Sequence, residues 1–327
     1  MRVGILGGLP PYMGAGGLDM RMKMTSKALV RAGVEVRRVE SMDEAESVDL
    51  VHAFGAMPPV WFAVRYWSRN RSPLVLSPVL LDVPRWQSAL DRVLASRKLP
   101  YTSTLNMHYD LIHRADRLVA LTEHERFKLR RVFRAADAKI SVIPNGTDAL
   151  AEAASQISAN PQRGGHVLQV GSISARKRQA DVIEMLGDRF ESRALGGFIG
   201  SDAERVEWDA LFRTRSKATW LGEVTDRQVL LGEFLGAGAF TLMSTSEGQS
   251  NAALEALALG VPSVLSDLPS HREFQSAFPH LVRVVRKDSE FLDAVEWATG
   301  QPRTPAAILS WDDVAKELIS LYERTIG

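Results

Sequence analysis

The sequence predicts an α/β protein made of two Rossmann-like domains, each an alternation of short parallel strands and helices. Its 327 residues are enough for two domains of ordinary size. The alternation begins with the apolar run Arg2–Leu6 and begins again at Val167–Val170. Between the halves lies Ala149–Gly165, a polar stretch rich in alanine and serine that is typical of a linker. We therefore expect one domain over residues 1–150 and a second over residues 151–310.

The composition excludes several classes of protein. Hydrophobic residues make up 45% and charged residues 24%, which is a soluble globular balance, and the net charge of +1 gives no field that favours nucleic acid. The absence of cysteine excludes disulfide scaffolds, zinc–thiolate sites and cysteine nucleophiles. The N-terminus has no signal-peptide pattern, and no apolar run approaches the roughly 20 residues of a membrane span. We expect a cytoplasmic protein.

The first half starts with the order strand, glycine-rich loop, helix and strand. Residues 7–17 form the loop after the first strand, and Leu18–Ala32 is predicted to be a helix because Gly33 stands where a C-cap glycine belongs. Val34–Val39 is the next strand. This order is typical of a Rossmann-like domain. The loop lacks the Gly-x-Gly-x-x-Gly pattern, which makes a dehydrogenase a poor interpretation.

Two later segments of this half allow two interpretations each. Residues 58–71 combine four aromatic side chains with three arginines. They form either a helix with its apolar face in the core, which we favour, or a segment that lies on a membrane surface. A second helix begins after the N-cap Thr122 and runs to Phe133 with a basic side. That side is typical of a solvated face, with contact to anionic lipid or to an acceptor as the alternative.

The second half repeats the alternation after the turn Pro144-Asn145-Gly146. A basic loop and a helix over residues 179–187 follow its first strand. Further strands are predicted at Ala194–Ile199, Ala218–Leu221, Gly238–Met243, Pro262–Ser266 and Leu281–Val285, with helices between them, including Ala203–Thr214 and Asp226–Leu235. Ser310 is the expected N-cap of a terminal helix.

The most informative stretch follows the buried strand Gly238–Met243. Small residues at the strand-to-helix turn let a ligand approach the backbone closely. The N–H groups at the start of the next helix and its dipole favour an anion there. Glu247 and Glu255 flank this site and would repel a phosphate, so we expect them to hold sugar hydroxyls instead. A phosphate with a polyol at each end is the layout of a nucleotide-sugar.

The string Glu247-Gly-x-Ser-Asn-x-x-Leu-Glu255-Ala-Leu-Ala-x-Gly260-x-Pro262 resembles the donor-site signature of glycosyltransferase family 4. These are retaining enzymes of GT-B fold, in which two Rossmann-like domains face a shared cleft. The resemblance covers nearly the whole chain and is strongest over residues 140–275. It also implies that the terminal helix 311–327 packs back on the first domain.

The resemblance implies a role for individual residues. Glu247 and Lys177 are the candidate catalytic residues, with Lys177 matching the lysine that neutralises the donor diphosphate. The candidate donor-binding residues are Gly16, Gly17, Gly171, Ser172, Arg176, Lys177, Glu223, Val224, Glu247, Gly248, Gln249, Ser250, Asn251 and Glu255.

This sequence departs from the family pattern at three places. Ser172 stands where an arginine is common and Arg178 where a glycine is common, although Arg176 is able to supply a second positive charge. The segment Ser77–Leu81 lacks the histidine that many relatives carry on the acceptor side. His52 and His108 are the remaining acceptor-side candidates, and for His52 a packed, hydrogen-bonded position is the alternative.

We therefore expect a retaining glycosyltransferase that moves a sugar from a nucleoside-diphosphate sugar, with a UDP-sugar favoured, to a hydroxyl acceptor such as a glycan, a lipid-linked precursor or a natural product. No metal and no further cofactor are expected, because basic side chains supply the positive charge. Peripheral membrane contact is an additional expectation, and nucleic acid is not an expected partner. The alternatives are another GT-B enzyme, such as a sugar-nucleotide epimerase, or a non-catalytic subunit that binds a nucleotide-sugar.

Overall fold

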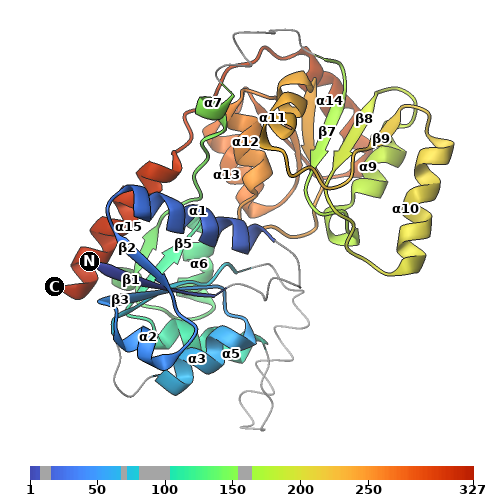
Figure 1. The fold of residues 1–327 in the computed structure, drawn as a ribbon. Helices are drawn as coiled ribbons and strands as arrows, with labels where there is room; N and C mark the ends of the chain where they lie inside the picture. Colours follow the sequence, from blue (N-terminus) through green and yellow to red (C-terminus); the bar gives the residue numbers. More distant parts are fainter. Residues whose placement is uncertain (8–15, 68–71, 81–103, 154–163) are drawn as a thin grey trace. The chain divides into compact units, whose positions relative to one another are not determined.

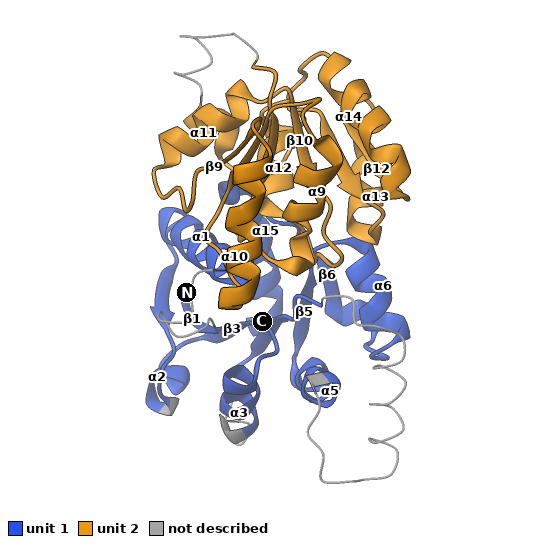
Figure 2. Ribbon diagram, turned by 90° about the vertical axis from the view of Figure 1, so that its right-hand side faces the viewer, with its two compact units in different colours: residues 1–146, 309–327 blue, residues 147–308 orange. Residues whose placement is uncertain are grey.

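The computed structural model describes residues 1–7, 16–67, 72–80, 104–153 and 164–327 (Figure 1). It divides into two compact units, which Figure 2 shows in different colours. Unit 1 comprises residues 1–146 and 309–327, and unit 2 comprises residues 147–308. The chain thus passes between units at 146/147 and 308/309, where the sequence predicted 150/151 and 310/311.

Unit 1 is built on a six-stranded sheet in which every pairing is parallel, in the order β2-β1-β3-β4-β5-β6. Its central strands β3 and β4 are buried along their whole length and mostly apolar, as is typical of strands with both faces covered. The strands are β1 (Arg2–Gly7), β2 (Glu35–Arg38), β3 (Leu50–Phe54), β4 (Leu74–Ser77), β5 (Arg117–Ala120) and β6 (Ile140–Val142).

Helices cover both faces of this sheet (Figure 1). One face carries α1 (Gly17–Arg31) and α15 (Trp311–Ile326). The other face carries α2 (Met42–Glu46), α3 (Pro58–Trp67), α5 (Thr104–Arg114) and α6 (Glu123–Arg131), and the 3-10 turn η2 (Asp137–Lys139) precedes β6. Thr122 caps α6 by accepting a hydrogen bond from the Glu125 N–H, as predicted.

The terminal helix α15 belongs to unit 1. Ser310 begins it with a capping box, in which its hydroxyl and the Asp313 carboxylate satisfy each other's backbone N–H groups. Arg31 of α1 pairs with Asp312 at 2.6 Å. The fully buried Tyr322 packs on the sheet, and its hydroxyl lies 2.6 Å from Nδ1 of His52 in β3. The helix is thus fixed by a cap, an ion pair and a buried hydrogen bond.

Unit 2 repeats the plan with a parallel sheet in the order β12-β11-β10-β7-β8-β9. The strands are β7 (Val167–Val170), β8 (Ser192–Leu195), β9 (Ala218–Trp220), β10 (Ala239–Leu242), β11 (Ser263–Ser266) and β12 (Val282–Val285). The helices and 3-10 turns are α7 (Ala149–Glu152), η3 (Ala175–Lys177), α9 (Gln179–Leu186), α10 (Asp202–Thr214), α11 (Arg227–Gly236), α12 (Asn251–Ala258), α13 (Pro269–Ala277), η4 (Asp288–Glu290) and α14 (Phe291–Gly300). Leu168 and Phe240 face α11 and α12, while Val167 and Val264 face α9 and α14. This confirms the predicted α/β class with two Rossmann-like sheets.

Two predicted segments differ in the structure. The strand expected over 194–199 ends at Leu195, because Gly196 has a φ of +145° that turns the chain out of the sheet. The first residues of the expected linker 149–165 form the short helix α7. The rest of that linker at 154–163 and most of the glycine-rich loop, 8–15, lie outside the described residues.

Candidate functional site

The carboxyl ends of β7 and β10 form the topological switch point of the unit 2 sheet. From β7 the chain proceeds to β8 and β9 on one side, and from β10 it proceeds to β11 and β12 on the other. Open α/β sheets bind ligands outside the strand ends at such a point. The backbone N–H of Thr245, after β10, donates to the carbonyl of Arg176, after β7, at 2.8 Å. The structure therefore brings together the two loops on which the sequence placed the candidate catalytic residues.

Glu247 lies at the centre of this switch point. Its Oε1 accepts hydrogen bonds from Ser244 Oγ at 2.7 Å and from Arg176 Nη1 at 3.1 Å. Nζ of Lys177 lies 3.4 Å from the same oxygen. Among the described residues, no hydrogen-bond partner engages Oε2. One carboxylate oxygen is thus held by the protein, and the other remains as an acceptor for a ligand.

The surroundings of Glu247 keep it ionised. Its side chain is only 10% exposed, and burial alone would raise its pKa. The charges of Lys177 and Arg176 and the hydrogen bond from Ser244 outweigh burial and hold the pKa of Glu247 below its ordinary value. At neutral pH the site therefore holds one carboxylate between two cations, so it is not a simple anion site.

Two glycines allow Lys177 to reach this position. Gly171 directly follows β7 with a φ of +137°, and a Cβ on it would lie 2.8 Å from Nζ of Lys177. Gly196 follows β8 with a φ of +145°, and a Cβ on it would lie 2.0 Å from the carbonyl oxygen of Gly171. The strand ends are therefore packed against each other and against the lysine with no room for side chains.

Gly196→Ala is expected to destabilise unit 2 by at least about 2 kcal/mol, since it combines an unfavourable φ with a backbone clash. Gly300→Ala is a matched control, because a Cβ at this helix end meets no atom of the described chain within 4 Å. Thermal melting of the two variants measures the difference. Equal melting temperatures would contradict the proposed close packing.

The second flanking acid, Glu255, is ion-paired within the unit. Nη1 of Arg227, the first residue of α11, donates to its Oε1 at 2.6 Å. Nε of the same arginine donates to Glu152 in α7 at 2.7 Å. Sequence reasoning missed Arg227, Glu152 and Ser244. The sequence offered only weak signals for them: Arg227 follows an N-cap aspartate, and Ser244 follows a strand.

The remaining candidates of unit 2 lie on the same edge of the sheet. Ser250 caps α12, with its hydroxyl accepting from the Ala253 N–H, and Asn251 begins that helix. Gly248 and Gln249 are half-buried in the preceding turn. Ser172 is held through its carbonyl by the side chain of Gln179. Glu223 is exposed and Val224 half-buried in the loop after β9.

Gly16 and Gly17 lie in unit 1 at the start of α1, after the loop that follows β1. Both are exposed, and a Cβ on either would meet no described atom within 4 Å. Contacts among the described residues therefore do not require glycine at these two positions. Close approach of a ligand to the backbone would require it. That Gly16 and Gly17 contribute to donor binding stays a prediction.

The two histidine candidates lie in unit 1, on β3 and α5. His52 is fully buried in β3, where Nδ1 lies 2.6 Å from Tyr322 Oη and Nε2 lies 2.8 Å from Ser77 Oγ. Burial holds its pKa well below the ordinary value, so the ring is neutral. This favours the packed alternative for His52. His108 is half-buried in α5, with its ring 6.2 Å from that of Phe133.

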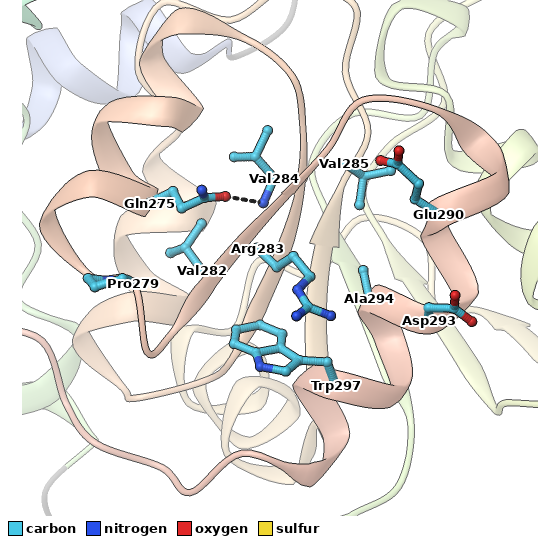
Figure 3. Close-up of a pocket in the computed structure, with 10 residues that line it drawn as sticks. All are labelled: Gln275, Pro279, Val282, Arg283, Val284, Val285, Glu290, Asp293, Ala294 and Trp297. Atoms are coloured by element: carbon cyan, nitrogen blue, oxygen red, sulfur yellow. Dashed lines mark hydrogen bonds between the residues drawn. The ribbon is translucent and has the colours of Figure 1, made fainter.

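A groove of about 450 Å³ lies elsewhere in unit 2, between α13, β12 and α14 (Figure 3). In it the guanidinium of Arg283 lies 4.7 Å from the centre of the Trp297 ring, and Gln275 accepts a hydrogen bond from the Val284 N–H. None of the candidate residues is among those that line it. The candidate residues of unit 2 therefore lie around the switch point and not in this groove.

The expectations about membrane contact and metal stay predictions. In α3, Val60, Trp61 and Val64 are buried and support the core interpretation, while Phe62 is 63% exposed. Among the described residues, no helix is both long enough and apolar enough to cross a bilayer. Within the same part of the chain, no cluster of three histidine or acidic side chains is arranged to hold a metal ion.

Comparison with known protein families gives two matches. A model described as Glycosyltransferase Family 4 matches residues 36–149, and a model described as Glycosyl transferases group 1 matches residues 164–298. The first lies within unit 1 and the second within unit 2. A search of curated proteins finds no match.

Solved structures show the same fold. Sucrose-phosphate synthase from Thermosynechococcus elongatus superposes with a TM-score of 0.73 at 17% identity, covering 99% of this chain and 98% of that one. The Anabaena protein HepE in complex with UDP and glucose gives a TM-score of 0.71 at 13% identity, covering 99% and 100%. AviGT4, a glycosyltransferase involved in avilamycin A biosynthesis, gives 0.67 at 16% identity, covering 99% and 98%.

Proposed function

The chain belongs to glycosyltransferase family 4 and has the GT-B fold, and from this premise we propose that it is a retaining enzyme that transfers a sugar from a nucleoside-diphosphate sugar to a hydroxyl acceptor. Unit 2 binds the donor and unit 1 the acceptor. The observation that carries the proposal is the cluster at the switch point, where Glu247 is held by Arg176 and Lys177 and keeps one oxygen available.

Each group of this cluster has a task in the transfer. Negative charge builds on the diphosphate as the bond to the sugar breaks, and Lys177 and Arg176 stabilise it. An ammonium has three donors, so Lys177 is able to contact Glu247 and a phosphate oxygen together. Glu247 accepts hydrogen bonds from the hydroxyls of the transferred sugar. With the positive charge supplied by side chains, turnover is expected to persist in EDTA.

We favour a UDP-sugar as donor. The likeness to HepE, solved with UDP and glucose and with UDP-glucose, supports this choice. A thermal-shift panel of UDP-, GDP-, ADP- and dTDP-sugars tests it, because a ligand that binds only the folded state raises the melting temperature. A rise with one donor of the panel, largest for a UDP-sugar, is the expected result. A panel without any shift would overturn the proposed function.

The alternatives predict different products. A sugar-nucleotide epimerase would convert its nucleotide-sugar with no acceptor present, and a non-catalytic subunit would bind without turnover. Analysis of the products from the best-binding donor, with and without an added sugar or lipid alcohol, separates the three. The proposed enzyme forms a new glycoside only when the acceptor is present.

A further inference from the structure

Arg227 bridges two carboxylates that come from different parts of unit 2. It is the first residue of α11, and its side chain is 34% exposed. Nε donates to Glu152 of α7, and Nη1 donates to Glu255 of α12, at 2.7 and 2.6 Å. The planar guanidinium has donors in a rigid fork, so its contact with one carboxylate fixes where it presents donors to the other.

Arg227 holds one oxygen of Glu255 and acts against the effect of burial on its charge. Its side chain is 16% exposed, and burial raises the pKa of Glu255 above its ordinary value. Arg227 opposes that rise, while the negative charge of Glu152 adds to it. Only Oε1 of Glu255 is engaged by a described residue, so Oε2 remains available as a hydrogen-bond acceptor for a ligand.

We propose that Arg227, held in place by Glu152, is a positioning residue that holds one carboxylate oxygen of Glu255 and directs the second oxygen to the ribose hydroxyls of the bound nucleotide. This rests on the proposed function, in which Glu255 lies at the ribose end of the donor. The ribose is remote from the bond that breaks. Loss of Arg227 therefore weakens ground-state and transition-state binding alike, which raises KM and leaves kcat nearly unchanged.

The test compares three variants by steady-state kinetics with a UDP-sugar. Arg227→Met is expected to raise the donor KM about tenfold or more, with kcat within about threefold, because a hydrogen bond to a charged group is lost. Arg227→Lys restores part of the loss. Arg193→Met is the matched control: Arg193 also bridges two glutamates, Glu191 and Glu233, and is 35% exposed, but it contacts no candidate donor residue.

Ribose-modified inhibitors give a readout that a purely structural role would not change. UDP is expected to inhibit the unmodified enzyme more strongly than at least one of 2′-deoxy-UDP and 3′-deoxy-UDP, and Arg227→Met removes that difference. The donor KM also responds to pH. It rises as pH falls and Glu255 takes up a proton, and without Arg227 this rise begins at higher pH, since Glu152 and burial then act on Glu255 unopposed.

Two failures are distinguishable. If the unmodified protein binds no nucleotide of the thermal-shift panel, the proposed function fails. The second failure concerns Arg227 alone. If the unmodified enzyme turns over a UDP-sugar, but Arg227→Met leaves the donor KM, its pH dependence and the stronger inhibition by UDP than by deoxy-UDP unchanged, the role of Arg227 is refuted and the proposed function stands. A lowered melting temperature that accompanies an unchanged preference for ribose also refutes it, because Arg227 then serves stability alone.

Discussion

Glu247→Ala is expected to lower kcat by at least about a hundredfold while the chain remains folded. The variant removes the acceptor for the hydroxyls of the transferred sugar, and hydrogen bonds of this kind strengthen as the sugar gains positive charge in the transition state. A hundredfold corresponds to about 2.7 kcal/mol of lost stabilisation. Steady-state turnover with the best-binding donor measures the effect.

The control for this variant is Glu296→Ala. Glu296 is an exposed acid of α14 that pairs with Arg189 and contacts no candidate site residue. It is expected to keep turnover within about twofold, as surface ion pairs contribute little. Glu247→Ala with full turnover would contradict the assigned role. Loss of nucleotide binding in a protein that never showed turnover would instead indicate the non-catalytic subunit.

Much of the fold was predictable because strand and helix patterns in this chain are local. Apolar runs such as Val167–Val170 give the strands, and the N-caps Thr122 and Ser310 lie where the sequence placed them. The order of the strands was not predictable from local pattern. The switch point between β7 and β10 arises from which strands pair, and that depends on contacts far apart in the sequence.

The sequence identified most residues of the candidate site, but it did not reveal the contacts between them. The spacing of Glu247 and Glu255 identified both acids, and the basic loop identified Arg176 and Lys177. The ion pairs among them were not foreseen, because the cations were expected to face only a diphosphate. Arg227 was missed for the same reason: its partner Glu255 lies 28 residues away, and no local pattern connects them.

Lys177→Met is expected to lower kcat by about a hundredfold to a thousandfold, the cost of removing one preorganised group that stabilises developing negative charge. Met keeps most of the side-chain volume beside Gly171, so the packing of the strand ends is largely retained. Lys217→Met is the control, because Lys217 is an exposed lysine of the same unit with no place in the site. A Lys177→Met enzyme with normal turnover would remove the lysine from the mechanism.

The pH dependence of the Lys177→Met variant independently tests whether Lys177 acts on the charge of Glu247. Lys177 is the largest of the groups that lower the pKa of Glu247, and burial acts in the opposite direction. In the unmodified enzyme the ionised form is therefore present throughout the neutral range and is lost only as pH falls through the lowered pKa. Without the lysine that pKa rises, so the acid limb of kcat/KM moves to higher pH. An acid limb that stays in place would show that Glu247 and Lys177 do not act together, even if both variants are slow.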